Sequence, residues 1–296
     1  MPLPLKPLAL LLVLFTFRLG AGEPPAAPGL RLETGMHTSA IESLAVDGTG
    51  RLLATASADK TIRLWDTATG EMRSILRPPI ADGDEGRLYA CALSRDGKVL
   101  AAGGNTGSAW DGSWCIYLFE VASGRLLRRV AGLPGVIRDL AYAEDGRLAV
   151  CLDRGGLRVF RPDGEEAFRD TDYAGAGTTC HFDRTGRLAA SSRDGYLRLY
   201  DRAGRLQAKV MTEGEPATVR FAPDGASLAV AYGAVTKIEV RSGLDGAADL
   251  FKKGRITVSG LDAYLGDRVP TLTGGRQTPT VIKPAAVPDF PLALLR

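Results

Sequence analysis

Three residues near the start of the chain have the types of a hydrolase triad, namely His37, Ser57 and Asp59. In a serine hydrolase, a histidine takes the proton of a serine nucleophile while a carboxylate orients the imidazole ring. Such enzymes present the serine on a strained turn and bind the oxyanion with backbone amides. The sequence around Ser57, ASADK, contains no nucleophile elbow and no oxyanion-hole motif. We therefore predict a structural role for the three residues, with hydrolysis as the alternative.

Other residues suited to catalysis or metal binding are few, because the chain has two histidines and four cysteines in 296 residues. His181 lies in the strand-like segment TTCHFDR, where we expect a half-buried histidine rather than a metal ligand. The spacing of the cysteines matches no zinc site. We predict buried free thiols at the cysteines, and neither a metal, a cofactor nor an enzymatic activity for the chain.

Two further stretches have partial signatures of binding sites. ADGDEG, at residues 81–86, is acidic but lacks the full spacing of a calcium loop, so a solvated acidic loop is the simpler interpretation. AAGGNTGSAWDG, at residues 101–112, is rich in glycine, yet it lies within a strand pattern and opens no predicted helix. A phosphate-binding loop requires such a helix, so the sequence does not support one.

A short strand pattern recurs along the chain and shows how these residues are positioned. Its five copies start 54, 41, 40 and 41 residues apart and read IRLWD (62–66), IYLFE (116–120), LRVFR (157–161), LRLYD (197–201) and IEVRS (238–242). Before each copy lie a glycine turn with an apolar run and another short strand. Alternating patterns with glycine turns and no helical periodicity predict antiparallel sheets. A four-stranded unit of about 40 residues cannot bury both faces alone, so the units must stack around an axis as a β-propeller.

The unit at residues 35–66 resembles a WD repeat (tryptophan-aspartate repeat), with Met36 inserted between a glycine and a histidine that are usually adjacent. The resemblance extends over residues 30–253 and, more loosely, to exported bacterial WD-repeat proteins. It implies a hydrogen-bonded network that ties a loop to the strands of one blade, in which the histidine bridges the serine and the aspartate. The residues concerned are His37, Ser57, Asp59 and Trp65.

The later repeats keep less of that network. Asp153 and Asp194 stand where Asp59 does, but no histidine precedes them at the matching loops. We therefore expect apolar packing to hold these blades. Cys91 and Cys180 share a repeat position with three apolar residues, so this position is expected to be buried in every blade; the three are Leu44, Leu140 and Val219.

The repeats divide the chain into four predicted segments. These are a signal peptide (1–22), a linker (23–29), a propeller of five four-stranded blades (30–253) and a degenerate sixth blade with an irregular tail (254–296). GLRLET, at residues 29–34, is expected to pair with the last blade, and RITVSGLDAY (255–264) and VPTLTGG (269–275) suggest two strands of the sixth. Because the repeat pattern weakens there, we expect an incompletely closed ring.

The first 22 residues have the order of a secretory signal: a lysine, an apolar run at 8–17 and then small residues. Arg18 after the run is untypical, and the alternatives are a membrane anchor or a buried N-terminal segment. The chain has a formal net charge of +3, and 35 basic face 34 acidic residues once Lys6 and Arg18 are removed. We predict an exported, monomeric protein without a stable membrane span, and the balanced charge argues against nucleic-acid binding.

The second repeat is longer than the others, and its extra residues fall in two connections that should lie on the same face of a propeller. The second connection contains two of the three tryptophans of the chain. Because exposed tryptophans with charges around them are typical of interaction hot spots, we predict a partner-binding surface here. The alternative is that the rings fold back onto the blade. The residues proposed are Trp110, Asp111, Trp114, Asp82, Asp84 and Glu85.

These observations favour a non-enzymatic scaffold that binds a protein or peptide through its loop-rich face. The alternative is an enzyme or small-ligand binder that uses the central channel, which would need acidic residues or histidines converging on the axis. Fold alone does not decide between them, because propellers have many activities.

Overall fold

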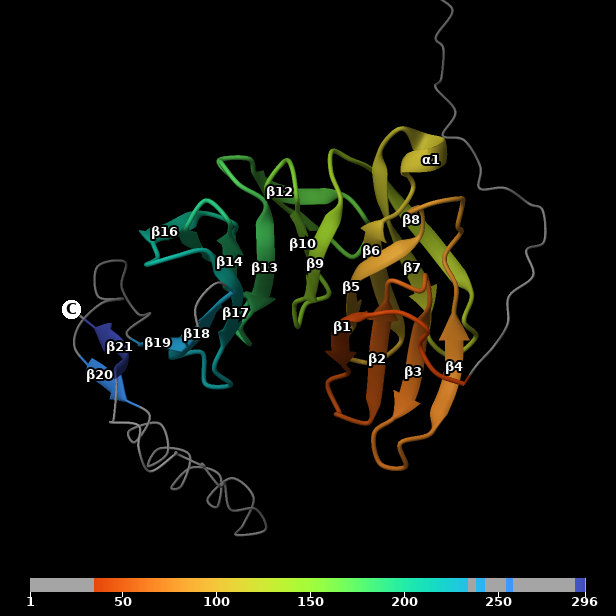
Figure 1. Cartoon of the computed structure of the whole chain (residues 1–296), viewed down its shortest axis with the longest axis horizontal. Coiled ribbons are helices and arrows are strands. Elements are labelled where there is room, and N and C mark those ends of the chain that lie inside the picture. Colours follow the sequence, from red (N-terminus) through yellow and green to blue (C-terminus); the bar gives the residue numbers. More distant parts are fainter. Residues whose placement is uncertain (1–34, 234–237, 243–253, 258–290, 296) are drawn as a thin grey trace, which may run out of the picture.

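The structure is a computed structural model that describes residues 35–233, 238–242, 254–257 and 291–295. The predicted leader, linker and closing strand at 1–34 lie outside the described residues. Figure 1 shows small antiparallel sheets that follow one another around an arc. The fold is therefore all-β, a propeller of five blades, as the repeats predicted.

Each of the first four blades is a four-stranded sheet whose strands follow the order of the chain. The first contains β1 (Ile41–Val46), β2 (Leu52–Ser57), β3 (Ile62–Asp66) and β4 (Met72–Leu76). The second contains β5 (Arg87–Leu93), β6 (Val99–Asn105), β7 (Trp114–Glu120) and β8 (Leu126–Leu133). The third contains β9 (Ile137–Tyr142), β10 (Leu148–Leu152), β11 (Leu157–Phe160) and β12 (Glu166–Asp170). The fourth contains β13 (Gly177–Phe182), β14 (Leu188–Ser192), β15 (Tyr196–Tyr200) and β16 (Leu206–Met211).

The fifth blade has three strands in the described residues, and a fourth would fall outside them. These strands are β17 (Pro216–Phe221), β18 (Ser227–Tyr232) and β19 (Ile238–Ser242). Among the described residues of the segment predicted as a degenerate sixth blade, β20 (Gly254–Thr257) pairs with β21 (Pro291–Leu295) in a two-stranded sheet. The strand expected at 255–264 is thus present at its beginning, whereas the one expected at 269–275 lies outside the described residues.

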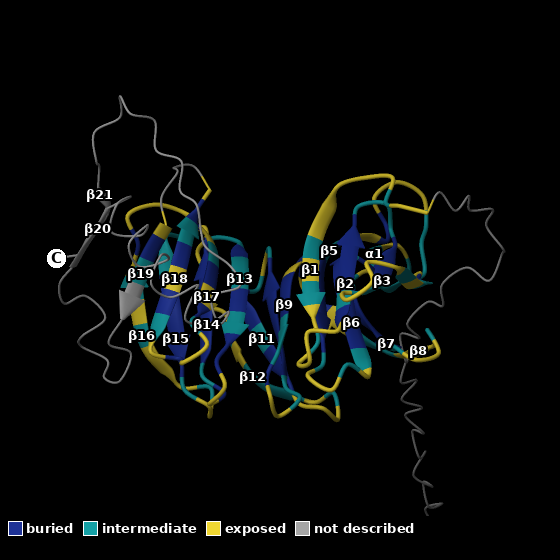
Figure 2. Cartoon of the chain, turned by 90° about the horizontal axis from the view of Figure 1, so that it is seen from below, coloured by how far each residue is buried: buried dark blue, intermediate teal, exposed yellow. Residues whose placement is uncertain are grey.

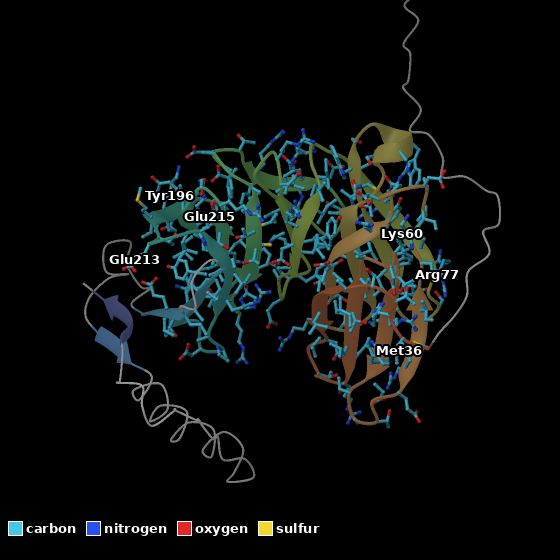
Figure 3. The ribbon with its side chains drawn as sticks, in the orientation of Figure 1. Met36, Lys60, Arg77, Tyr196, Glu213 and Glu215 are labelled. Atoms are coloured by element: carbon cyan, nitrogen blue, oxygen red, sulfur yellow. The ribbon has the colours of Figure 1, made fainter. Side chains whose placement is uncertain are left out.

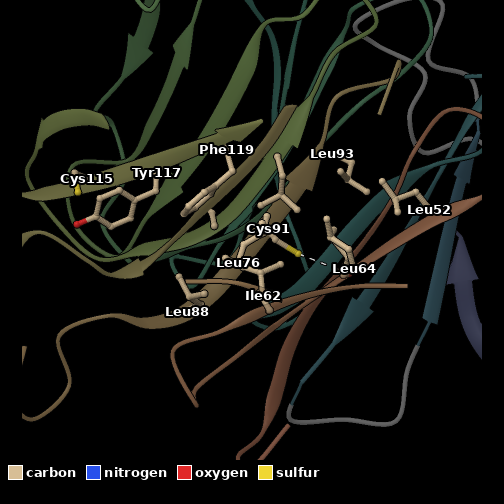
Figure 4. Packing of buried hydrophobic residues seen from close by; sticks show 14 residues of the cluster. Leu52, Ile62, Leu64, Leu76, Leu88, Cys91, Leu93, Cys115, Tyr117 and Phe119 are labelled. Carbon is tan, nitrogen blue, oxygen red and sulfur yellow. Dashed lines mark hydrogen bonds between the residues drawn. The ribbon is translucent and has the colours of Figure 1, made fainter. Parts of the chain in front are cut away.

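The core is divided among the interfaces between consecutive blades. Alternate residues of each strand point to opposite faces of a sheet, so Ala54 and Ala56 of β2 face the second blade. Figure 4 shows the first of these interfaces, where side chains of two blades interlock. Its largest fully buried members are Ile62, Leu64, Leu76, Leu88, Leu100, Tyr117 and Phe119. Three similar clusters join the second blade to the third, the third to the fourth and the fourth to the fifth.

The innermost strands of neighbouring blades are also tied by a repeated hydrogen bond. A polar side chain on one inner strand accepts a backbone N–H from the next inner strand, and the accepting residue holds the same repeat position each time. The pairs are Ser43 Oγ with Cys91 N at 3.2 Å, Asp139 Oδ2 with Cys180 N at 2.9 Å and Thr179 Oγ1 with Val219 N at 2.9 Å. In the second blade this position is Ala90, which has no polar side chain.

The position shared by the two inner-strand cysteines is buried in four blades of five. Cys91, Leu140, Cys180 and Val219 are at most 5% exposed, and all four cysteines are buried and free. Leu44 is 64% exposed, so the expectation of burial is wrong for the first blade. The side chain at this position faces the preceding blade, and no described blade precedes β1. Figure 2 shows the resulting exposure along β1.

A polar network holds the first blade, although one partner differs from the expected one. The His37 Nδ1 lies 2.8 Å from Asp59 Oδ2, and Nε2 lies 2.7 Å from the hydroxyl of Thr55 rather than that of Ser57. The same hydroxyl accepts the indole N–H of Trp65 at 2.9 Å. Ser57 instead accepts the backbone N–H of Asp59 and donates to Ser39 O. The expected bridge between His37 and Ser57 is therefore wrong, because the ring lies over the middle of β2 and not over its end.

The fourth blade has a polar network of its own, which the sequence did not predict, in addition to the apolar clusters on its two faces. Arg198 has no exposed surface, and it donates to Asp194 Oδ2 and Ser192 Oγ at 2.7 Å each. Its guanidinium also lies 3.9 Å from the ring centre of Tyr173. A buried guanidinium needs such partners, because an unpaired charge would be costly to bury.

One further element, the helix α1 (Ser108–Asp111), was not predicted. It lies in the connection between β6 and β7, where the glycine-rich stretch was expected to open no helix. Gly107 and Gly112 flank it with φ of 92° and 61°, a left-handed conformation that glycine adopts without strain. A four-residue helix leaves too little periodicity in the sequence to be recognised.

Replacing Asp59 with alanine should destabilise the protein by about 1.5–3 kcal/mol, because its carboxylate accepts hydrogen bonds from His37, Thr38 and Thr61. Burial raises the pKa of Asp59, but the hydrogen bonds from Thr61 and His37 outweigh it and hold the pKa below its usual value. The stabilisation is thus present above the ordinary pKa and is lost as the pH falls through the lowered one. Urea denaturation from pH 7 to pH 3 measures this, with the exposed Glu71→Ala as control. Equal stability of both variants would contradict it.

Asp139 should show the opposite pH dependence. Burial raises its pKa to about 6, although Arg220 and the Cys180 N–H favour the charged form. The folded state then holds a proton that the unfolded state has lost, so this residue's contribution to stability falls as the pH rises from about 4 to about 6. Asp139→Asn should remove that slope and keep the acceptor for Cys180, whereas Asp139→Ala should cost about 1–3 kcal/mol. Identical pH slopes in the wild type and Asp139→Asn, measured by urea denaturation, would refute this assignment.

Candidate functional site

The triad-like residues of the first blade are enclosed. Both nitrogens of His37 are engaged, one by Asp59 and the other by the hydroxyl of Thr55, a residue that is 5% exposed. That hydroxyl also accepts a hydrogen bond from Trp65, and Ser57 has no exposed surface. A nucleophile must reach its substrate, so this arrangement is suited to holding the blade together rather than to hydrolysis.

The two long connections of the second blade are joined by one carboxylate. Glu85, between β4 and β5, is 4% exposed. It accepts hydrogen bonds from Gly107 N at 2.5 Å, Ser108 Oγ at 2.9 Å and Ala109 N at 3.1 Å, at the start of α1. The sequence predicted Glu85 as a contact residue, but the structure places it inside, where it orders the connection between β6 and β7.

The side chains of Asp111 and the two tryptophans pack in part against the blades. The Asp111 side chain is 3% exposed and lies 3.2 Å from Arg129 Nη1. Trp110 packs against the cluster between the first and second blades, and Trp114 against the cluster between the second and third. Trp114 also donates its indole N–H to Asn105 Oδ1 at 2.9 Å and carries the Arg154 guanidinium 5.3 Å from its ring centre. Both residues are half-buried, so neither tryptophan is wholly enclosed by the blades.

Asp82 and Asp84 lie on the exposed tip of the connection between β4 and β5. Lys60, in the turn between β2 and β3, donates its ammonium to Ala81 O at 3.0 Å and Gly83 O at 2.8 Å. These bonds fix the acidic tip against the first blade. No signal in the sequence pointed to Lys60, since its partners are main-chain carbonyls. The six predicted residues thus come together on one face, where two carboxylates are exposed and two are buried.

The cavities near the axis of the arc contain few side chains that are free to bind a metal or to catalyse a reaction. On the loop-rich face, a cavity of about 440 Å³ is lined by Arg138, Arg193 and Glu215, and Figure 3 shows Glu215 and Lys60 towards opposite ends of this face. At the opposite mouth, a cavity of about 460 Å³ includes His181, whose pKa burial lowers to about 4. Its Nδ1 accepts the Phe221 N–H at 3.0 Å, so this nitrogen is not available to a metal or substrate.

Metal sites and membrane-spanning helices have no counterpart among the described residues. No group of three or more histidine, cysteine, aspartate or glutamate side chains there is arranged to hold a metal ion. Within the same part of the chain, no helix has the length and apolar character needed to cross a membrane.

Comparisons with known proteins agree with this architecture. Residues 32–66 match the family model described as WD domain, G-beta repeat. The chain is 30% identical over 174 residues to WD repeat-containing protein SL1-17 of Schistosoma mansoni, which covers 57% of this chain and 54% of that protein. It is 24% identical over 208 residues to Pre-mRNA-processing factor 19 homolog 2 of Arabidopsis thaliana, covering 66% of this chain and 36% of that protein.

A third relative, WD repeat-containing protein 90 of Mus musculus, is 26% identical over 147 residues, 45% of this chain and 7% of that protein. The chain thus spans about half or less of the length of these relatives, all of which are eukaryotic. One matching repeat, similarity to WD-repeat proteins and five antiparallel blades together identify the architecture of this chain as a β-propeller of the WD-repeat type.

Proposed function

We propose that this chain is a non-enzymatic scaffold that binds a protein or peptide partner through its loop-rich face. The observation that carries the proposal is the ordered acidic tip of the second blade. Lys60 and Glu85 fix its two connections from either side, while Asp82 and Asp84 stay exposed. A loop that is already ordered loses less conformational entropy on binding, so such a surface is suited to recognition.

The contact surface divides into residues that touch a partner and residues that position them. The contact part consists of Asp82, Asp84 and the half-buried Trp110 and Trp114, and these residues favour a partner with basic and apolar side chains. Glu85 and Asp111 are buried and act by ordering the connections.

The rival function, catalysis or small-ligand binding in the channel, has less support. It needs titratable groups free to act at the axis, and the one histidine there has an occupied Nδ1 and stays neutral. We propose that the chain works without a cofactor. We also propose that it is a monomer, and light scattering on the purified protein tests its oligomeric state.

Reversing the two exposed charges should abolish partner capture without affecting the fold. We expect Asp82→Lys with Asp84→Lys to lower capture about tenfold or more, because like charges would then face a basic partner. The melting temperature should stay within about 1 °C of the wild type, since exposed substitutions cost little. Glu71→Lys, in the turn between β3 and β4 on the opposite face, is the matched control. Quantitative mass spectrometry of affinity-captured proteins measures the effect, and equal capture by all three proteins would refute this surface.

We further propose that the chain is exported from the cytoplasm. The support is the order of charged, apolar and small residues in 1–22. Expression with a C-terminal tag should give a mature form that begins near residue 23, found outside the cytoplasm. N-terminal sequencing of that form tests the proposal, and Met1 at the start of the mature protein would refute cleavage.

A further inference from the structure

An arginine closes the gap between the third and fourth blades on the face opposite the loop-rich one. The Arg147 guanidinium lies 5.3 Å from the ring centre of Phe182 on the fourth blade. It donates Nη2 to Gly186 O of the next hairpin turn at 3.2 Å, and Nε to Asp145 Oδ1 of its own turn at 3.0 Å. Stacking, a main-chain carbonyl and a carboxylate together hold the guanidinium in place.

The same arrangement joins the fourth blade to the fifth. There the Arg187 guanidinium lies 5.6 Å from the ring centre of Phe221. It donates to Gly225 O and to Asp183 Oδ2, each at 2.6 Å. The chain therefore contains two copies of one recognition geometry, in which an aromatic ring, a turn carbonyl and a carboxylate surround a guanidinium between two blades.

Between the second and third blades the arginine is replaced by valine. In each blade, the position of this arginine directly precedes a leucine of the second strand, and that leucine pairs with the last residue of the innermost strand. The leucines are Leu100, Leu148 and Leu188. The preceding residues are Val99, Arg147 and Arg187. Lys98 does not take the role, because its side chain is 80% exposed and lies 3.5 Å from Asp96.

The groups that would surround a guanidinium are nevertheless present. Tyr142 holds the position of Phe182 and Phe221 at the end of its inner strand. It lines a cavity of about 720 Å³ together with Val99, the carboxylate residue Asp96 and the turn glycine Gly146. This volume lies within the range of ligand pockets.

The remaining walls of this cavity are apolar, with charges at its rim. The apolar side chains are Leu118, Leu127, Val130, Leu148 and Phe160. Arg95 pairs with Glu144 at 2.6 Å, Arg128 donates to Asp163 O and Pro162 O, and Asp145 is paired with Arg147. Arg161 lies 3.7 Å from Asp163. The charges at the rim therefore cancel largely among themselves. Asp96 accepts hydrogen bonds from the Ser94 hydroxyl at 2.7 Å and the Lys98 N–H at 3.1 Å, much as Asp183 accepts bonds from its own turn, and a bound guanidinium would compete with the exposed Lys98 ammonium for its second oxygen. Recognition thus depends mainly on the ring and the apolar walls, with Asp96 as the nearby carboxylate.

We propose that the cavity between the second and third blades binds an arginine side chain of a partner polypeptide. The guanidinium stacks on Tyr142 and contacts Asp96 and Gly146, as the chain's own arginines do at the two following interfaces. The apolar walls accept a neighbouring apolar side chain of the same segment. This site lies on the face opposite the loop-rich one, so it is independent of the proposed partner surface there.

The test uses the peptide Ala-Leu-Arg-Leu-Ala-amide, with fluorescein attached to its N-terminus, and the full chain in a fluorescence polarisation titration. We expect saturable binding, weakened about tenfold when citrulline replaces arginine, because citrulline has nearly the same shape without the charge. Tyr142→Leu should weaken binding of the arginine peptide by a similar factor. Tyr142→Phe, which keeps the ring, should not.

A second pair of variants fills the cavity from within. Val99→Arg supplies the missing guanidinium and should abolish peptide binding, whereas Val99→Leu should leave it unchanged. Thermal melting confirms that each variant is folded. No saturable binding, equal binding of the citrulline peptide, or full binding by folded Val99→Arg would overturn the proposal. Peptide-sensitive self-association in light scattering would also overturn it, because a second copy of the chain would then be the occupant.

Discussion

Each blade of this chain is a small sheet with two faces to cover, and the fold depends on neighbours covering them. The four apolar clusters lie between consecutive blades. A fully buried leucine or phenylalanine side chain contributes about 1.5–3 kcal/mol, so an interface that contains several such side chains outweighs any single hydrogen bond within a blade. The order of the blades along the chain then follows, because adjacent repeats are the nearest available neighbours. The exposed Leu44 shows the reverse case, a face whose neighbour is not among the described blades.

Because packing supplies most of the stability, the polar networks inside blades are free to differ. In the first blade, His37 joins Asp59 to Thr55. In the fourth, Arg198 joins Asp194 to Ser192 at the matching strand and turn. Both networks fix the turn between the second and third strands to the strands themselves, with a histidine in the centre of one and an arginine in the centre of the other. A catalytic interpretation of His37, Ser57 and Asp59 overlooks this structural role of the three residues.

The sequence predicted what depends on periodicity and little of what depends on neighbours. Alternation and the repeat interval predicted the strands, and the shared repeat position predicted the burial of Cys91 and Cys180. Thr55 and Ser57 lie two residues apart on one face of β2, so the sequence could not tell which hydroxyl the His37 ring would reach. Glu85 shows the same difficulty, since an acidic residue among exposed acidic residues carries no sign that it orders α1. The partner surface and the exported location remain predictions.

The constraint on packing also indicates where a repeat protein of this kind can vary. A change inside an interface must preserve the fit of two blades, whereas a connection can lengthen freely, as in the second blade. The edge of an interface tolerates more change than its core and less than a connection. A residue at the edge either closes the gap between the two blades or leaves it open, and neither choice disturbs the core. Val99 in place of an arginine leaves Tyr142 and Asp96 beside an open cavity, while the cluster beneath stays intact. A single side chain at such an edge thus decides whether two blades recognise each other or something else.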